Sequence, residues 1–376
     1  MSAQREIRWL VACAAGILLV TMGIRQSLGL FVSPLNTATG LGLASISLAL
    51  AVGQFTWGAV QPLAGAAAER WGATRVLQAG LLLLALGCLL TPWMAGAWGL
   101  TACLGVLAAA GSGAGSFSVL MGAAASRLPA AQRGTASGII NAGGSLGQFL
   151  VAPLAQALIL AVGWMGALWS MAGLALLAWP LVWRLRRAGQ ALAQPVSGAG
   201  SAPASAAGDA APELLLRQAL RQALRDRSYG LLHLGFFTCG FHIAFLVTHL
   251  PGEVATCGLP ASVAAQSLAL IGLANVAGSL LAGACVSRFR SKMVLALMYG
   301  SRAVLVLAYL WAPKDTLTFW VFAVGLGLTW LATVPPTAAI VGKLFGLRHL
   351  GTLFGLTLLS HQVGGFLGAW LGGLVM

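Results

Sequence analysis

Arg25 lies deep inside the first long apolar segment of the chain, where little water can solvate a guanidinium group. A charge at that depth costs roughly 2.5–3.5 kcal/mol on insertion scales. The sequence has only seven acidic residues, and none falls in the middle of an apolar segment. A bound anion could supply the missing negative charge, because a guanidinium matches a carboxylate in bidentate geometry. The alternative is a structural arginine bonded to backbone carbonyls and buried serines.

Other polar side chains interrupt later apolar segments and could complete a substrate site. His242 and His361 can titrate near neutral pH, so either could carry a coupling proton; the alternative is a histidine satisfied inside the core. Arg302 also lies within an apolar segment. The remaining predicted substrate-binding residues are amides, which could equally bond one helix to another: Gln54, Asn141 and Gln148.

The composition places these residues in a membrane. Hydrophobic residues make up 59% of the 376-residue chain and charged residues only 7%, whereas about 25% is usual in soluble domains. Lipid is therefore the expected solvent for most side chains. Fifty glycines agree with this, because small residues let membrane helices approach closely.

Apolar segments of about 20 residues predict eleven membrane-spanning helices. A barrel is excluded, because its strands need only about 9–11 residues of alternating pattern. The predicted spans cover residues 9–32, 44–66, 75–94, 98–124, 134–161, 164–184, 229–250, 262–286, 293–312, 316–341 and 350–374. Pro335 and Pro336 should break the tenth of these.

The chain carries 21 Lys and Arg residues, and nearly all fall in loops on one side of the predicted spans. By the positive-inside rule that side is cytoplasmic. We therefore expect a multi-pass protein of the bacterial cytoplasmic (inner) membrane with its N-terminus inside. The net charge of +14 is then a topology signal and does not predict a nucleic-acid partner.

A polar segment separates the sixth and seventh spans. Residues 188–211 are rich in Ala, Gly, Ser and Pro, which indicates a flexible linker. In residues 212–227 arginines recur every four positions between leucines, which predicts a basic amphipathic helix on the inner membrane surface. A solvated linker helix is the alternative.

An internal repeat relates the two halves of the chain. Gly134-Thr-Ala-Ser-Gly138 returns as Gly351-Thr-Leu-Phe-Gly355, 217 residues later, and Gly65 and Arg70 return as Gly283 and Arg288. At the same spacing, the image of Arg25 falls beside His242. We therefore predict an all-α membrane protein of two pseudo-symmetric six-helix bundles, the second lacking its last helix. The expected divisions are an N-terminal bundle at 1–187, a linker with its amphipathic helix at 188–228, and a C-terminal bundle of five helices at 229–376.

The loop after the second span reads Gly65-Ala-Ala-Ala-Glu69-Arg70-Trp-Gly72-Ala-Thr-Arg75. It resembles the cytoplasmic loop motif of the major facilitator superfamily. The resemblance implies alternating access, with a carboxylate and an arginine forming ion pairs that hold the inner gate. The predicted gating residues are Gly65, Glu69, Arg70, Gly72, Arg75, Gly283 and Arg288.

Three further segments are similar to bacterial monocarboxylate-transporter-like and oxalate/formate-antiporter-like members of that superfamily. They begin at Gly23-Ile-Arg25, Cys239-Gly-Phe-His242 and Leu359-Ser-His361. This resemblance implies secondary transport of a small organic anion, with a proton or counter-anion as a possible coupling partner. The alternatives are a transporter of a neutral or amphipathic compound, such as a drug or vitamin, and an inactive or sensor protein of transporter type.

No constellation typical of an enzyme occurs in the sequence, and no Walker loop. The six cysteines form no CxxC or Cys/His cluster. We therefore expect no enzymatic activity, no cofactor and no metal. The expected partners are a small-molecule substrate and membrane lipid, and the expected state is a monomer.

Overall fold

The computed structural model describes residues 3–94, 96–193 and 216–375, and these residues form helices joined by short turns. The first half contains α1 (Ala3–Ser27), η1 (Leu28–Phe31), α2 (Val32–Thr39), α3 (Leu43–Trp71), α4 (Ala73–Leu90), η2 (Thr91–Trp93), α5 (Ala97–Leu100), the π-helical η3 (Thr101–Ala108), α6 (Ala109–Ala114), α7 (Phe117–Ala125), α8 (Ala130–Leu177) and α9 (Trp179–Ala193).

The second half contains α10 (Leu216–Arg225), α11 (Arg227–Thr256), α12 (Ala261–Arg288), α13 (Ser291–Trp311), α14 (Thr316–Thr329), η4 (Leu331–Thr333), α15 (Val334–Phe345) and α16 (Leu350–Val375). Apolar side chains on the facing sides of these helices form the core, while many large apolar side chains stay exposed on the outside. An exposed apolar exterior is expected where lipid surrounds the protein.

Nine helical segments within the described residues are long and apolar enough to cross a membrane. One of these segments, 130–192, is bent at Gly163 and therefore contains two membrane crossings. The φ of Gly163 is 75°, a conformation that glycine adopts without strain. The 29 residues of α3 are also sufficient, since they extend about 43 Å at 1.5 Å per residue. The eleven predicted spans are all present as helical segments.

Several boundaries differ from the predicted ones. α9 continues to Ala193, so the prediction of a flexible linker from residue 188 was wrong at its start; 194–215 lie outside the described residues. The fourth predicted span is interrupted at Gly115 and Ser116. In the tenth, the break predicted at Pro335 falls just before it, in η4, because proline is tolerated in the first turn of a helix.

The internal repeat is visible in the packing. Gly147 of α8 faces the Leu19 carbonyl of α1, and its image Gly364 of α16 faces the Phe237 carbonyl of α11. In each case a Cβ atom would collide with the neighbouring backbone. The same close helix pair has therefore formed twice, once in each bundle, as expected for membrane helices that meet through small residues.

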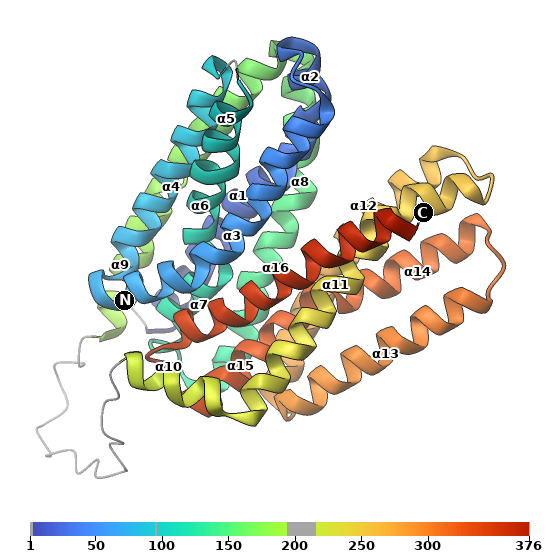
Figure 1. The fold of residues 1–376 in the computed structure, drawn as a ribbon. Coiled ribbons are helices and arrows are strands. Elements are labelled where there is room, and N and C mark those ends of the chain that lie inside the picture. The colour runs from blue at the N-terminus through green and yellow to red at the C-terminus, as the bar shows by residue number, and fades with distance from the viewer. Residues whose placement is uncertain (1–2, 95, 194–215, 376) are drawn as a thin grey trace, which may run out of the picture.

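The two bundles converge at one end and diverge toward the other (Figure 1). The converging end holds the N-terminus, α10 and the turns after α3 and α12, and it carries most of the described Lys and Arg residues. We call it the basic end. The largest contacts between the bundles are those of α3 with α16 and of α8 with α12. The structure is thus closed at the basic end.

Replacing Gly147 by alanine is expected to destabilise the protein by about 1–3 kcal/mol, because the added methyl overpacks a backbone contact. Gly173 in the same helix is the matched control, since a Cβ there meets nothing within 4 Å. The midpoint of thermal unfolding in detergent should fall for Gly147→Ala and stay level or rise for Gly173→Ala. Equal midpoints would contradict the packing role.

Candidate functional site

The contact between α3 and α16 closes one side of the basic end. Gly65 lies against the backbone of Gly351, where a Cβ atom would come within 2.5 Å. One turn further, Glu69 accepts a hydrogen bond from the Thr352 hydroxyl at 2.7 Å and pairs with Nδ1 of His349 at 2.5 Å. The missing side chains at the two glycines bring the backbones close enough for these bonds across the bundles.

The contact between α8 and α12 closes the other side with the repeat images of the same residues. Gly283 lies against Gly134, as its image Gly65 lies against Gly351. Ser287 occupies the position of Glu69 and bonds to Thr135, the image of Thr352: its Oγ accepts from the Thr135 amide at 3.0 Å and lies 3.1 Å from the Thr135 hydroxyl. One of these contacts therefore joins a carboxylate to an imidazole and a hydroxyl, and the other is held by hydroxyl groups and a backbone amide.

The remaining predicted gating residues lie around these contacts. Gly72, with a φ of 89°, makes the turn between α3 and α4. Arg70 is exposed and lies 5.6 Å from the Trp71 ring, and Arg75 and Arg288 are exposed at helix ends. Glu69 thus pairs with a histidine and a threonine, where the motif had suggested an arginine, because the loop before α16 places His349 directly opposite it.

Arg25 lies farther from the basic end, where α1, α3 and α16 meet. Its guanidinium stacks over the Trp57 ring at 4.1 Å and donates a hydrogen bond to the side-chain oxygen of Gln54. Gln54 in turn donates to the side-chain oxygen of Gln362, and Gln362 packs directly on Gly58. A chain of hydrogen bonds therefore runs from a cation in one bundle to an amide in the other.

Arg302 makes a second polar cluster inside the C-terminal bundle and is only 2% exposed. It donates to Nε2 of His242 at 2.8 Å, to the Cys239 sulfur at 3.1 Å, and to the hydroxyl and carbonyl oxygens of Thr329. His242 donates from Nδ1 to the Thr238 carbonyl at 2.6 Å, so Nε2 holds the lone pair that accepts from Arg302. This arrangement requires the neutral imidazole.

Neither the half-buried Arg25 nor the buried Arg302 has a carboxylate partner in the part of the chain that the structure describes. The acids there are engaged elsewhere: Glu6 with Arg184, Glu69 with His349, Glu253 with Tyr309, and Asp226 and Asp315 as caps of α11 and α14. The amide of Thr318 also lowers the pKa of the Asp315 carboxyl. The polar partners of both guanidinium groups among the described residues are therefore neutral groups.

The other predicted substrate-binding residues lie in different parts of the structure. His361 lies in the Arg25 region, with Nδ1 at 3.3 Å from Gln362 Nε2 and its ring at 5.6 Å from Phe236. Asn141 instead bonds to the Ser279 hydroxyl at 2.9 Å and the Leu331 carbonyl at 2.8 Å, which fits its alternative as an interhelical bond. Gln148 is half-buried in α8. His242 joins Arg302, so the repeat did not place it opposite Arg25.

Several residues at these sites were missed in the sequence. Gln362, Thr329, His349 and Thr352 became visible only when helices from different parts of the chain came together. Cys239, one of the six cysteines outside any cluster motif, was not among the predicted site residues. Gln362 follows His361 directly, and Thr352 matches Thr135 in the repeat, so both had a signal in the sequence that was not used.

The chain is similar to known membrane proteins over its whole length. Residues 13–369 match the family model described as Major Facilitator Superfamily. The uncharacterized MFS-type transporter YcxA of Bacillus subtilis (strain 168) is 23% identical over 387 residues, covering 100% of this chain and 90% of that protein.

Solved structures agree at the level of the fold. The proton:xylose symporter XylE, bound to 6-bromo-6-deoxy-D-glucose, superposes with a TM-score of 0.72 at 16% identity, covering 100% of this chain and 90% of its own. The E. coli fucose:proton symporter FucP gives a TM-score of 0.67 at 16% identity, with 100% and 92% covered. These similarities show the fold and do not identify the ligand.

The double variant T135C/S287C is expected to form a disulfide, because the two side-chain oxygens already lie 3.1 Å apart. Oxidation should then hold the basic end closed, and a reductant should release it. Each single variant controls for pairing with native cysteines such as Cys285, and T135C/S301C controls for random collision. Crosslinking is followed by the shift of the intact protein on a gel. Equal yields for T135C/S287C and T135C/S301C would contradict the closed contact.

Proposed function

Since this chain belongs to the major facilitator superfamily, a family of membrane transporters and not of enzymes, we propose that it carries a small organic anion across the bacterial inner membrane. The observation that carries this proposal is Arg25. Its guanidinium lies where the bundles meet, stacked on Trp57, and has only amide oxygens as polar partners among the described residues. A monocarboxylate would supply a negative charge beside this guanidinium, which has no carboxylate partner among the described residues.

Through the hydrogen bonds that start at Arg25, a bound substrate can change a contact between the two bundles. A carboxylate that binds Arg25 competes with Gln54 for the same guanidinium. Gln54 also holds Gln362 of the opposite bundle, so substrate binding alters a contact between the bundles. A ligand shifts a conformational equilibrium only through such differential contacts.

Arg302 supports the same substrate class from a second position. It is buried beneath His242 and would reach a bound anion only after the cluster rearranges. Until then its charge adds to the positive potential of the site, which attracts anions. His361, next to Gln362, is the residue we favour for a coupling proton, because His242 accepts from Arg302 as a neutral ring.

The transport cycle we propose is alternating access. With the basic end cytoplasmic, as the positive-inside rule favours, the structure corresponds to a state closed toward the cytoplasm. Opening requires α3 to part from α16 and α8 from α12, so the two bundles would rock as units about the Arg25 region. We place their division in the segment that follows Ala193.

A neutral polyhydroxylated substrate is the second candidate. Gln54 and Gln362 present amides beside the Trp57 ring, and such groups can bind sugar hydroxyls and an apolar sugar face. The structural neighbours XylE and FucP are sugar:proton symporters. In this case Arg25 would orient the glutamines without meeting a charge.

Arg25→Gln is expected to lower lactate uptake about 10–100-fold, because a hydrogen-bonded charge contributes about 1.5–3 kcal/mol. The lactate uptake of Arg25→Lys should lie between those of the wild type and Arg25→Gln, since lysine keeps the positive charge but cannot bind a carboxylate in bidentate geometry. Uptake of radiolabelled lactate into proteoliposomes measures the effect. Arg290→Gln, an exposed arginine at the start of α13, is the matched control. Lactate uptake by Arg25→Gln at the wild-type rate would remove the anion proposal.

The two substrate classes separate in a parallel assay with xylose. An anion carrier should move lactate and not xylose, and Gln362→Ala should reduce lactate uptake less than Arg25→Gln does, because the amide contacts the substrate only through Gln54. A sugar carrier should give the opposite order, with xylose uptake lost in Gln362→Ala and retained in Arg25→Gln.

A further inference from the structure

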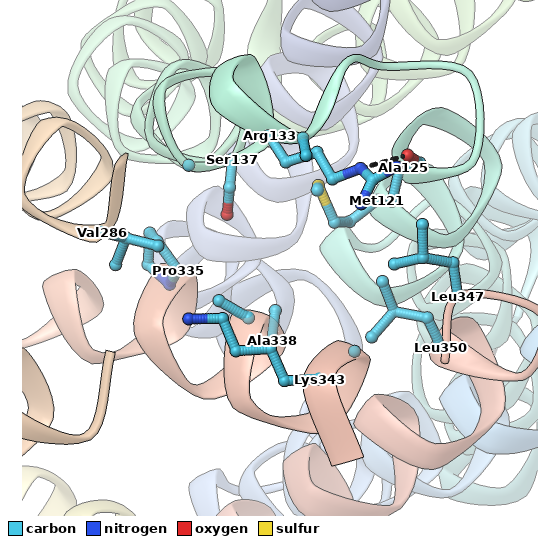
Figure 2. A pocket seen from close by; sticks show the side chains of 14 residues that line it. Met121, Ala125, Arg133, Ser137, Val286, Pro335, Ala338, Lys343, Leu347 and Leu350 are labelled. Atoms are coloured by element: carbon cyan, nitrogen blue, oxygen red, sulfur yellow. Dashed lines mark hydrogen bonds between the residues drawn. The ribbon is translucent and has the colours of Figure 1, made fainter. Parts of the chain in front are cut away.

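A pocket of about 170 Å³ lies at the basic end, away from Arg25 and between the two bundles. Met121 of α7 and the start of α8 form one wall, while Val286 of α12, Pro335 of α15 and Leu350 of α16 belong to the other (Figure 2). Most of its surface is apolar. Because its walls come from both bundles, the pocket exists in this form only while the basic end is closed.

One polar side chain in this wall has no partner. Ser137 of α8 is 3% exposed, and its hydroxyl oxygen makes no hydrogen bond in the structure. In Figure 2 this hydroxyl points into the pocket, toward the helix that carries Lys343. A buried hydroxyl without a partner costs about 1–3 kcal/mol. The orphaned group therefore indicates a missing hydrogen-bonding ligand.

Two cations line the same pocket, one from each bundle. Arg133 donates from Nε to the Ala125 and Leu128 carbonyls at 3.0 Å, and its terminal amino groups make no hydrogen bond to any described residue. Lys343 reaches only the Ser291 hydroxyl, at 3.5 Å. No acidic residue of the described chain lines the pocket. The two positive charges are therefore uncompensated there.

We propose that this pocket is a second ligand site, which takes a small carboxylate with a short apolar body. The carboxylate accepts hydrogen bonds from the Arg133 guanidinium, the Lys343 ammonium and the Ser137 hydroxyl. The apolar body packs against Met121 and Val286. Two cations and a hydroxyl suit an anionic head, while the apolar remainder of the wall disfavours a highly charged ligand such as a phosphate ester.

Occupancy of this site has a conformational consequence. Arg133 is one residue from Gly134 and four from Ser137, so it belongs to the segment of α8 that forms the gate contact with α12. A ligand that bridges Arg133 and Lys343 binds only when the bundles are together at this end. It therefore raises the population of the closed state, and a carboxylate on the basic side slows opening there.

The test uses butyrate and the full-length protein in detergent, on an Arg25→Gln background. Titration calorimetry should still detect butyrate binding, because this site does not use Arg25. Adding R133Q and K343Q together should weaken it by at least about tenfold, and S137A should weaken it less. K292Q, an exposed lysine in the first turn of α13, is the matched control and should leave the affinity unchanged.

A second readout follows the conformation. Butyrate should speed disulfide formation in T135C/S287C, and K343Q alone should cancel the effect. Lys343 is exposed, so this variant is expected to fold normally, which its thermal midpoint checks. Absence of binding in Arg25→Gln at millimolar butyrate, or binding unchanged by R133Q and K343Q, would overturn the proposal. Loss of lactate uptake in Arg25→Gln alone bears on the transport proposal and leaves this one standing.

Discussion

The close backbone contact of paired glycines across the bundles is the constraint on which the closed structure depends. Gly65 lies against Gly351, and Gly283 against Gly134, and a Cβ atom on Gly65, Gly134 or Gly283 would collide with the facing helix. In lipid, helices gain little from burying apolar side chains against each other, so dispersion at short range and hydrogen bonds must hold them. The bonds of Glu69 and Ser287 form only because these glycines let the helices approach. The pocket between the bundles and the reach of Gln54 to Gln362 both follow from that approach.

Charge placement sets the chemistry available to this scaffold. Arg25 and Arg302 have amides, a thiol, an imidazole, a hydroxyl and a carbonyl as polar partners, and no carboxylate of the described residues pairs with either. Such an arrangement is expensive in a low-dielectric interior unless a mobile anion completes it. Arg25 differs from Arg302 in lying at the border between the bundles, where a solute can reach it. The same chemical group therefore has two different surroundings, and the substrate role that we propose belongs to Arg25.

The sequence was sufficient for the parts of the fold that depend on local pattern. Span lengths, the turn at Gly163 and the break before Pro335 follow from apolar length and backbone preference, and the repeat identified Gly65 and Gly283 as equivalent. Side-chain contacts between helices that are distant in the sequence could not be predicted from local pattern. His349 meets Glu69 across 280 residues, and Gln362 meets Gln54 across 308. The repeat predicted that His242 would lie opposite Arg25, but in the structure His242 accepts a hydrogen bond from Arg302. The position of a residue on a helix does not by itself fix the direction of its side chain.

The two gate contacts occupy equivalent positions but differ in chemistry. Ser287 and Thr135 meet through hydroxyl groups and a backbone amide, whereas Glu69 and His349 join a carboxylate to an imidazole. The two halves of the chain place different side chains, Glu69 and Ser287, at equivalent positions, so equivalent backbone contacts carry different bonds. An architecture built from two similar halves can thus be held closed by different bonds on its two sides.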